Sequence, residues 1–85
     1  MNIRLLFFAG LREALGQAHE DLVLPAGVGS LGDLRTFLAG RGGAWARQMG
    51  PGRNLRAAVN QDMATPEVAL KDGDEVAFFP PVTGG

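Results

Sequence analysis

The sequence predicts an α+β fold in which one mixed β-sheet is covered on one face by a single main helix. Apolar strand-like segments stand near both ends of the chain, and the clearest helical pattern lies between them, starting at Ser30. The chain has 85 residues, of which 46% are apolar, and this size supports one domain with one modest core. We expect residues 1–79 to form that domain and residues 80–85 to form an extended, flexible tail.

The first quarter of the chain predicts two strands and a short helical turn. Residues 2–8 are almost continuously apolar, which indicates a strand at least partly covered on both faces, and Ala9-Gly10 ends it. A helical turn over residues 11–15 is closed by Gly16. Residues 19–24 then form a second strand, which we pair antiparallel with the first.

The main helix has a start signal, an apolar stripe and a stop signal. The Ser30 hydroxyl can cap the N–H of Asp33, whose negative charge suits the first turn of a helix. Gly40 ends the helix, and Trp45 and Met49 predict a further turn or two of helix whose indole packs under it. The apolar stripe consists of Leu31, Leu34, Phe37 and Leu38.

The last third of the chain predicts two hairpin-like returns. Residues 55–60 form a third strand, Asn60-Gln61 is a turn signal, and residues 63–64 can return as a short strand. Residues 71–74 form the strongest turn, where Gly73 is free to take a positive φ. Residues 75–79 form the final strand.

The economical arrangement of these elements places the first and last strands side by side and parallel in the middle of a sheet of four to five strands. The helix then covers one face, which is the β-grasp, or ubiquitin-like, architecture. Because side chains alternate along a strand, Leu6, Phe8 and Phe79 are expected on the face away from the helix, and Met63 can extend this apolar patch. We expect the patch to bind partner proteins.

Composition excludes several kinds of function. The net charge is −1 and the eight basic residues form no dense run, so no nucleic-acid partner is expected. There is no cysteine, which removes disulfides, a thiolate nucleophile and zinc–thiolate or iron–sulfur sites. His19 is the single histidine and Ser30 the single serine, so we predict neither a metal site nor a self-sufficient enzyme. No segment approaches the roughly 20 apolar residues of a membrane span, and we expect a cytoplasmic protein without a membrane partner.

The chain ends in Pro80-Pro81-Val82-Thr83-Gly84-Gly85. The two prolines favour an extended tail over a continued strand, and the terminal glycines can pass through a channel too narrow for any side chain. Six extended residues reach at most about 20 Å. This pattern predicts that the Gly85 carboxylate enters the active site of another protein while the domain stays outside.

Fold and tail together resemble the sulfur-carrier branch of the ubiquitin-like proteins, and within it the small subunits of molybdopterin synthases. Three segments carry the resemblance: Leu6 to Ala9 with Arg12-Glu13, Ala58 to Gln61, and Asp72 to Gly85, the most specific of the three. The resemblance covers nearly the whole chain. The glycine-rich segment over residues 40–52 departs most in character, and it matches no motif of that family.

The resemblance implies a sulfur delivery cycle centred on the Gly85 carboxylate. An activating enzyme of the ubiquitin-activating type adenylates Gly85 with ATP and Mg²⁺, and a sulfur donor enzyme converts the adenylate to a thiocarboxylate. The tail then enters the large catalytic subunit, in a heterotetramer with two copies of each chain, and gives its sulfur to cyclic pyranopterin monophosphate to form the molybdopterin dithiolene. This chain itself would bind no cofactor.

Three alternatives remain open at this point. The thiamine-pathway sulfur carrier shares the fold and the tail chemistry, although residues 78–83 and the segment around Trp45 speak against it. A protein modifier would be conjugated to lysines through Gly85. A plain binding module would have an inert tail.

Overall fold

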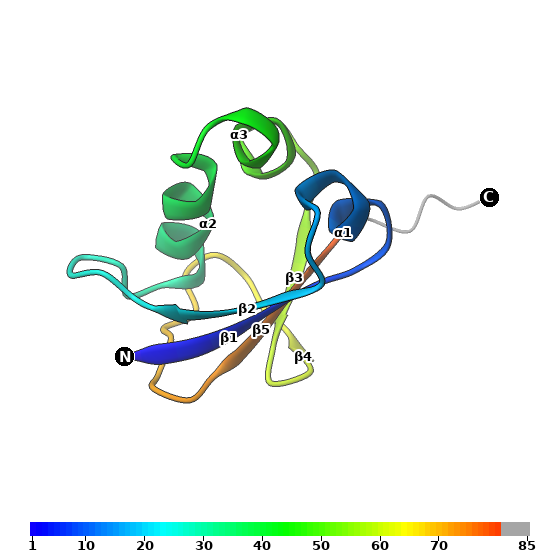
Figure 1. Ribbon diagram of the computed structural model, residues 1–85. Helices are drawn as coiled ribbons and strands as arrows, with labels where there is room; N and C mark the ends of the chain where they lie inside the picture. Colours follow the sequence, from blue (N-terminus) through cyan, green and yellow to red (C-terminus); the bar gives the residue numbers. More distant parts are fainter. Residues whose placement is uncertain (81–85) are drawn as a thin grey trace.

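The computed structural model describes residues 1–80, and in this range three helices pack against one face of a five-stranded sheet (Figure 1). The elements follow one another as β1 (Asn2–Phe7), α1 (Ala9–Leu15), β2 (His19–Val23), α2 (Leu31–Ala39), α3 (Gly43–Met49), β3 (Arg56–Val59), β4 (Asp62–Met63) and β5 (Glu75–Phe79). Prediction and structure agree on the α+β class. None of the helices within residues 1–80 has the length and apolar character needed to cross a membrane.

The strand order is β2-β1-β5-β3-β4, so the first and last strands form the centre of the sheet. β1 and β5 run parallel, with Phe7 opposite Phe78, while β2 is antiparallel to β1 and β3 is antiparallel to β5. This is the β-grasp arrangement that the sequence predicts. Because β1 and β5 are parallel, both finish at the same end of the sheet, and the chain leaves the sheet there at Pro80.

The core lies between the sheet and the helices. The inward side chains of β1 and β5 are almost fully buried, as the alternation rule predicts. The apolar stripe of α2 covers them, and Ser30 caps that helix by accepting a hydrogen bond of 3.1 Å from the Asp33 N–H. The buried side chains from these elements are Ile3, Leu5, Phe7, Leu31, Leu34, Leu38, Val76 and Phe78.

Several element boundaries differ from the sequence prediction by one or two residues: β2 ends at Val23, β3 covers Arg56–Val59, and α1 begins at Ala9, two residues earlier than expected. β1 ends at Phe7 because Phe8, still extended, already accepts hydrogen bonds from the N–H groups of Leu11 and Arg12 and so begins α1. α1 and α3 have seven residues each against nine in α2, so the accessory helices are longer relative to the main helix than expected.

The hairpin between β3 and β4 is set by Asn60 and Gln61, which have φ values of 50° and 71°. Two successive positive φ angles are typical of the tight turn that joins antiparallel strands, and β4 therefore begins at Asp62, one residue earlier than predicted. The Asn60 amide donates to Asp74 at 2.9 Å, and Asp74 also accepts the Lys71 N–H at 2.8 Å. These hydrogen bonds, the Lys71 one above all, hold the pKa of Asp74 below its ordinary value.

The connection from α2 to α3 is tied to the sheet by Arg41. Its guanidinium donates to both carboxylate oxygens of Glu20 on β2, at 2.8 and 2.6 Å, and lies 4.5 Å from the centre of the Trp45 ring. Trp45 in turn meets Phe7 edge-on, with ring centres 5.5 Å apart. The indole predicted to pack under the main helix is thus half-buried between β1 and Arg41.

Candidate functional site

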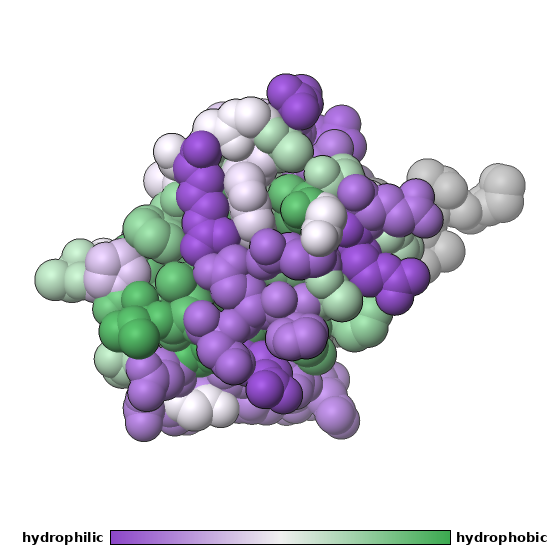
Figure 2. All heavy atoms as spheres, in the orientation of Figure 1, coloured by the Kyte–Doolittle hydropathy of each residue, from purple (hydrophilic) through white to green (hydrophobic). Residues whose placement is uncertain are grey.

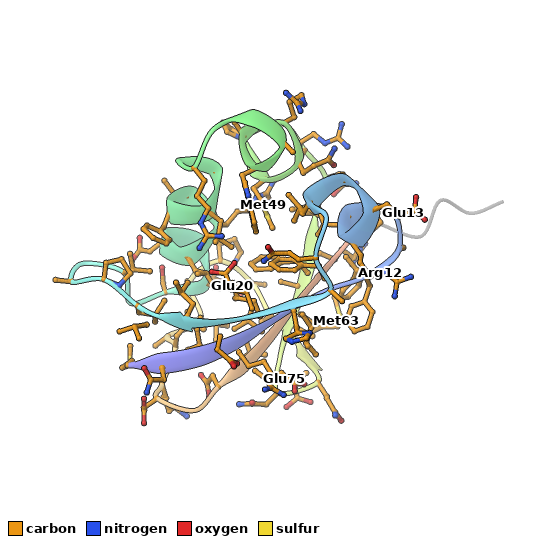
Figure 3. The ribbon with its side chains drawn as sticks, viewed as in Figure 1. Arg12, Glu13, Glu20, Met49, Met63 and Glu75 are labelled. Atoms are coloured by element: carbon orange, nitrogen blue, oxygen red, sulfur yellow. The ribbon has the colours of Figure 1, made fainter. Side chains whose placement is uncertain are left out.

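A row of apolar side chains crosses the face of the sheet that the helices leave uncovered. Leu6 lies opposite Ala77, Ala77 opposite Ala58, and Ala58 opposite Met63, so one residue from each of β1, β5, β3 and β4 contributes. Directly opposed residues share a face, and Leu6 follows the inward Leu5, so the row lies on the outer face. Figure 3 shows Met63 on this side, away from the helices.

Two aromatic side chains extend the row towards the end of the sheet. Phe8 and Phe79 follow the opposed pair Phe7 and Phe78, and the Phe8 N–H donates to the Phe78 carbonyl at 3.3 Å. Phe8 is 47% exposed and Met63 59% exposed, whereas Leu6 and Phe79 are half-buried. We call Leu6, Phe8, Ala58, Met63, Ala77 and Phe79 the apolar outer face.

Charged residues lie next to the apolar outer face on the side away from Pro80. Arg4 lies opposite both Asp21 and Glu75, one row before Leu6, and donates to Asp21 at 3.1 Å. A separate set of apolar side chains gathers near the β2–α2 connection (Figure 2), where Val23 at the end of β2 is 69% exposed. The apolar outer face is therefore a distinct patch at the end where β5 finishes.

Pro80 stands at the rim of a cavity of about 400 Å³ between α1 and residues 52–55, whose wall includes Leu11 and Leu55. Arg35 on α2 holds residues 49–53, which lead into this segment, by donating to three backbone carbonyls: Met49 at 2.7 Å, Gly50 at 3.0 Å and Arg53 at 2.6 Å. The backbone next to the point where the chain leaves the sheet is thus held in place by hydrogen bonds from Arg35.

A second cavity, of about 340 Å³, lies between the start of α2, β3 and residues 63–66, with Phe78 and Met63 in its wall. The walls of the two cavities contain neither a carboxylate nor a histidine, and the Ser30 hydroxyl is engaged in the helix cap. Within residues 1–80 no three His, Cys, Asp or Glu side chains are placed to hold a metal ion. The described surface offers places to bind a partner, and no pair of groups suited to acid–base chemistry lines either cavity.

The structure brings the four predicted patch residues, Leu6, Phe8, Met63 and Phe79, onto one face and places Pro80 next to it. The predicted tail residues Pro81, Val82, Thr83 and Gly84, and the predicted reactive Gly85, lie outside the described residues. Sequence reasoning did not find Ala58 and Arg56, which complete this face from β3. The alternation along residues 56–59 would have found them once the pairing with β5 was known.

Comparison with known proteins assigns the chain to a family. A family model described as the ThiS family matches residues 5–85. The molybdopterin synthase sulfur carrier subunit of Escherichia coli is 43% identical over 98% of this chain and 99% of its own length, and that of Haemophilus influenzae is 41% identical over 98% and 99%. The small archaeal modifier protein 3 of Haloferax volcanii is 38% identical, with both chains fully covered.

Solved structures share the fold. SAMP1 from Haloferax volcanii superposes with a TM-score of 0.80 at 29% identity, with both chains fully covered. The fold also matches a chain of the complex of subunits 1 and 2 of molybdopterin-converting factor from Helicobacter pylori, with a TM-score of 0.68, 23% identity and full coverage of both chains. Because the family model spans residues 5–85 and two curated relatives exceed 40% identity along nearly their whole length, the chain belongs to the ThiS family of β-grasp proteins.

Proposed function

We propose that this chain is the sulfur carrier subunit of a molybdopterin synthase and carries sulfur as a thiocarboxylate on Gly85. The observation that carries the proposal is the junction at Pro80. There the apolar outer face, of which Phe8 and Met63 are exposed, lies beside the start of a Pro-Val-Thr-Gly-Gly sequence. The sulfur carrier subunits at 43% and 41% identity support it.

The chemistry of the chain end fits this division of labour. A carboxylate is a poor electrophile until one oxygen becomes a good leaving group. Attack of the Gly85 carboxylate on the α-phosphorus of ATP, on the activating enzyme with Mg²⁺, releases pyrophosphate and leaves an acyl-adenylate. Hydrosulfide supplied by the donor then attacks the acyl carbon, and AMP leaves with the C–O bond electrons, so that the thiocarboxylate remains. A chain without cysteine has no thiol of its own to carry sulfur, so the terminal carbonyl takes that place.

Delivery requires a second protein that accepts the tail and supplies the catalytic side chains. The Helicobacter pylori structure named above is a complex of subunits 1 and 2 of molybdopterin-converting factor. We assign the apolar outer face to the contact with the large subunit, in a heterotetramer, and to the contact with the activating enzyme. Full burial of a Phe or Met side chain is worth about 1.5–3 kcal/mol. Phe8 and Met63 are about half exposed in the free chain, so docking can gain roughly 1 kcal/mol from each.

The first experiment measures the intact mass of the chain after incubation with activating enzyme, ATP and a sulfide source. Replacement of one oxygen by sulfur adds about 16 Da. A chain that lacks Gly85 is the control: it should gain no mass, and its free energy of unfolding should change by less than ~0.5 kcal/mol. If the truncated chain still supported molybdopterin formation, or if the full chain never gained the mass, the proposal would be wrong.

The second experiment tests the docking face. Phe79→Asp should leave the isolated domain folded and weaken the complex with the large subunit by at least ~2 kcal/mol, as expected for a central aromatic contact. Val23→Asp is the matched control, since Val23 is exposed, apolar and remote from Pro80. Equal binding by Phe79→Asp and the unchanged chain in a titration would refute the assignment, as would unfolding of the Phe79→Asp domain.

A protein modifier is the second candidate, because the small archaeal modifier protein 3 is 38% identical over the full chain. Such a modifier would share activation at Gly85 and differ in the acceptor, which would be a lysine amine. Mass spectrometry of proteins from cells that express the chain distinguishes the two. Peptides with Gly85 linked to lysine support the modifier, and a thiocarboxylate without such peptides supports the carrier.

A further inference from the structure

The fold gathers basic residues that the sequence spreads apart. Arg56 lies opposite Phe79, the last residue of β5, and Arg53 lines the cavity whose rim includes Pro80. Arg12 projects from α1, which follows directly on β1 at the same end of the sheet (Figure 3). We call Arg12, Arg53 and Arg56 the arginine rim.

The three guanidiniums of the arginine rim are exposed and have no carboxylate partner among residues 1–80. The other arginines of the sheet and of α2 are engaged: Arg4 pairs with Asp21, and Arg35 donates to backbone carbonyls. Glu13 on α1 is the acidic residue nearest in sequence to Arg12. Glu13 also lies at this end (Figure 3), so the arginine rim brings three guanidiniums together with one carboxylate, and none of the three forms an ion pair within residues 1–80.

The opposite end of the sheet is acidic. The turn before β5 and the turn after β3 meet there, because Asn60 donates to Asp74. These turns and the first residues of the strands that follow them carry four carboxylates, and Lys71 is the basic residue among them. The carboxylates are Asp62, Asp72, Asp74 and Glu75. A net charge of −1 thus conceals a charge gradient along the strands, positive at the end where Pro80 lies.

We propose that the arginine rim docks on an acidic protein surface that frames the opening through which the partner receives the tail. The inference rests on the proposed function and adds the chemistry of the partner surface. The rim adjoins the apolar outer face through Arg56 and Phe79, so it forms the charged margin of the same contact. A gradient along the strands also turns the tail end towards an acidic partner before contact, which raises the association rate.

A broad protein surface fits the arginine rim better than a small anion does. Its members come from three separate segments: α1, residues 50–55 and β3. Arg53 lines the cavity near Pro80, whereas Arg56 lines the cavity near Met63, so their guanidiniums do not line one common cavity. Recognition of a phosphate or pyrophosphate needs several donors around one anion.

The test compares two charge reversals of equal size at opposite ends of the sheet. Arg56→Glu changes the rim, and Lys71→Glu makes the same change of charge in the distant turn. Association with the large subunit is followed by stopped flow at ionic strengths from about 20 mM to about 500 mM. At the upper value, salt screens the attraction between exposed charges on the two proteins. Thermal melts of both free variants check that they fold.

We expect Arg56→Glu to lower the association rate constant at least about tenfold at low salt, with little change in dissociation, and to converge with the unchanged chain at high salt. Arg12→Glu, on a different element, should act in the same direction. Lys71→Glu should leave the rate constant within about twofold. An equal loss in Arg56→Glu and Lys71→Glu would mean that only net charge matters, which overturns the inference.

Three further outcomes also overturn it. Titration of the free chain with inorganic pyrophosphate, followed by the side-chain Nε–Hε resonances of the arginines, tests the small-anion alternative, and saturable shifts at all three rim residues would assign the rim to phosphate. If the chain forms and delivers the thiocarboxylate normally but its association rate does not depend on salt, the inference about the arginine rim is wrong and the proposed function stands. Absence of both the mass gain and any association would refute the proposed function and the rim with it.

Discussion

Replacement of Arg41 by methionine should destabilise the domain by about 1.5 kcal/mol at pH 7. Arg41 makes two charge-assisted hydrogen bonds to Glu20, and the side chains are only 28% and 23% exposed. Hydrogen bonds to charged groups contribute about 1.5–3 kcal/mol, and an exposed ion pair at most about 1 kcal/mol. Methionine keeps apolar contact with the Trp45 ring, so that packing is not lost. Because the pair is only partly buried, we expect a cost between the two ranges, about 1.5 kcal/mol. For a domain of this size it corresponds to a melting temperature about 6–12 °C lower.

The effect should depend on pH with a definite sign. The hydrogen bonds from Arg41, more than any other cause, lower the pKa of Glu20 below its ordinary value. A carboxyl group with a lowered folded-state pKa contributes stability above its unfolded pKa, and this contribution is lost as the pH falls through the folded value. The difference in melting temperature between the unchanged chain and Arg41→Met should therefore be full at pH 7 and shrink below about pH 4.5.

Circular dichroism melts of both chains between pH 7 and pH 3 measure this difference. Arg47→Met is the matched control, since Arg47 is an exposed arginine of α3 without an ion pair among the described residues, and it should shift the free energy of unfolding by less than ~0.5 kcal/mol. A difference for Arg41→Met that stayed constant down to pH 3, or one no larger than that of Arg47→Met, would refute the reasoning.

Two further substitutions separate structural roles from functional ones. Ser30→Ala should cost about 1 kcal/mol through loss of the cap on Asp33 and leave sulfur transfer per folded molecule unchanged; lost transfer with an unchanged melt would instead give Ser30 a catalytic role. Arg35→Met should cost about 2 kcal/mol because three backbone carbonyls lose their donor, and it should speed hydrogen exchange selectively over residues 49–55. Exchange that rose equally in β1 would contradict a local role for Arg35.

Local rules predicted the parts of this fold that depend on neighbouring residues. The Ser30 cap, the stripe through Leu34 and the turn at Gly73 follow from spacing along the chain, and the structure confirms each of them. The parallel pairing of the first and last strands followed from economy of connection and is also confirmed. These features needed no knowledge of distant partners beyond the order of the elements.

The parts that sequence alone did not supply depend on register between strands. Ala58 and Ala57 are adjacent small residues, and a shift of one residue would exchange the one that faces outward. The same is true of Arg56, whose place beside Phe79 follows from the pairing of β3 with β5. Basic residues that look scattered in sequence therefore gather in space, and spacing along the chain carries no signal for it. The predicted roles of Pro81 to Gly85 lie outside the described residues and stay predictions.

The central position of β5 has a kinetic consequence. Arg4 lies opposite Glu75 where β1 and β5 are joined, so the two middle strands meet only when segments about seventy residues apart close a loop. Contacts of such long range slow folding, because chain entropy is lost before the burial of Val76 and Phe78 compensates for it. Until that closure, β1 and β3 lack their common neighbour. A partly folded chain thus cannot hold Phe79 between Phe8 and Arg56, and a partner that recognises this corner selects chains that have completed folding.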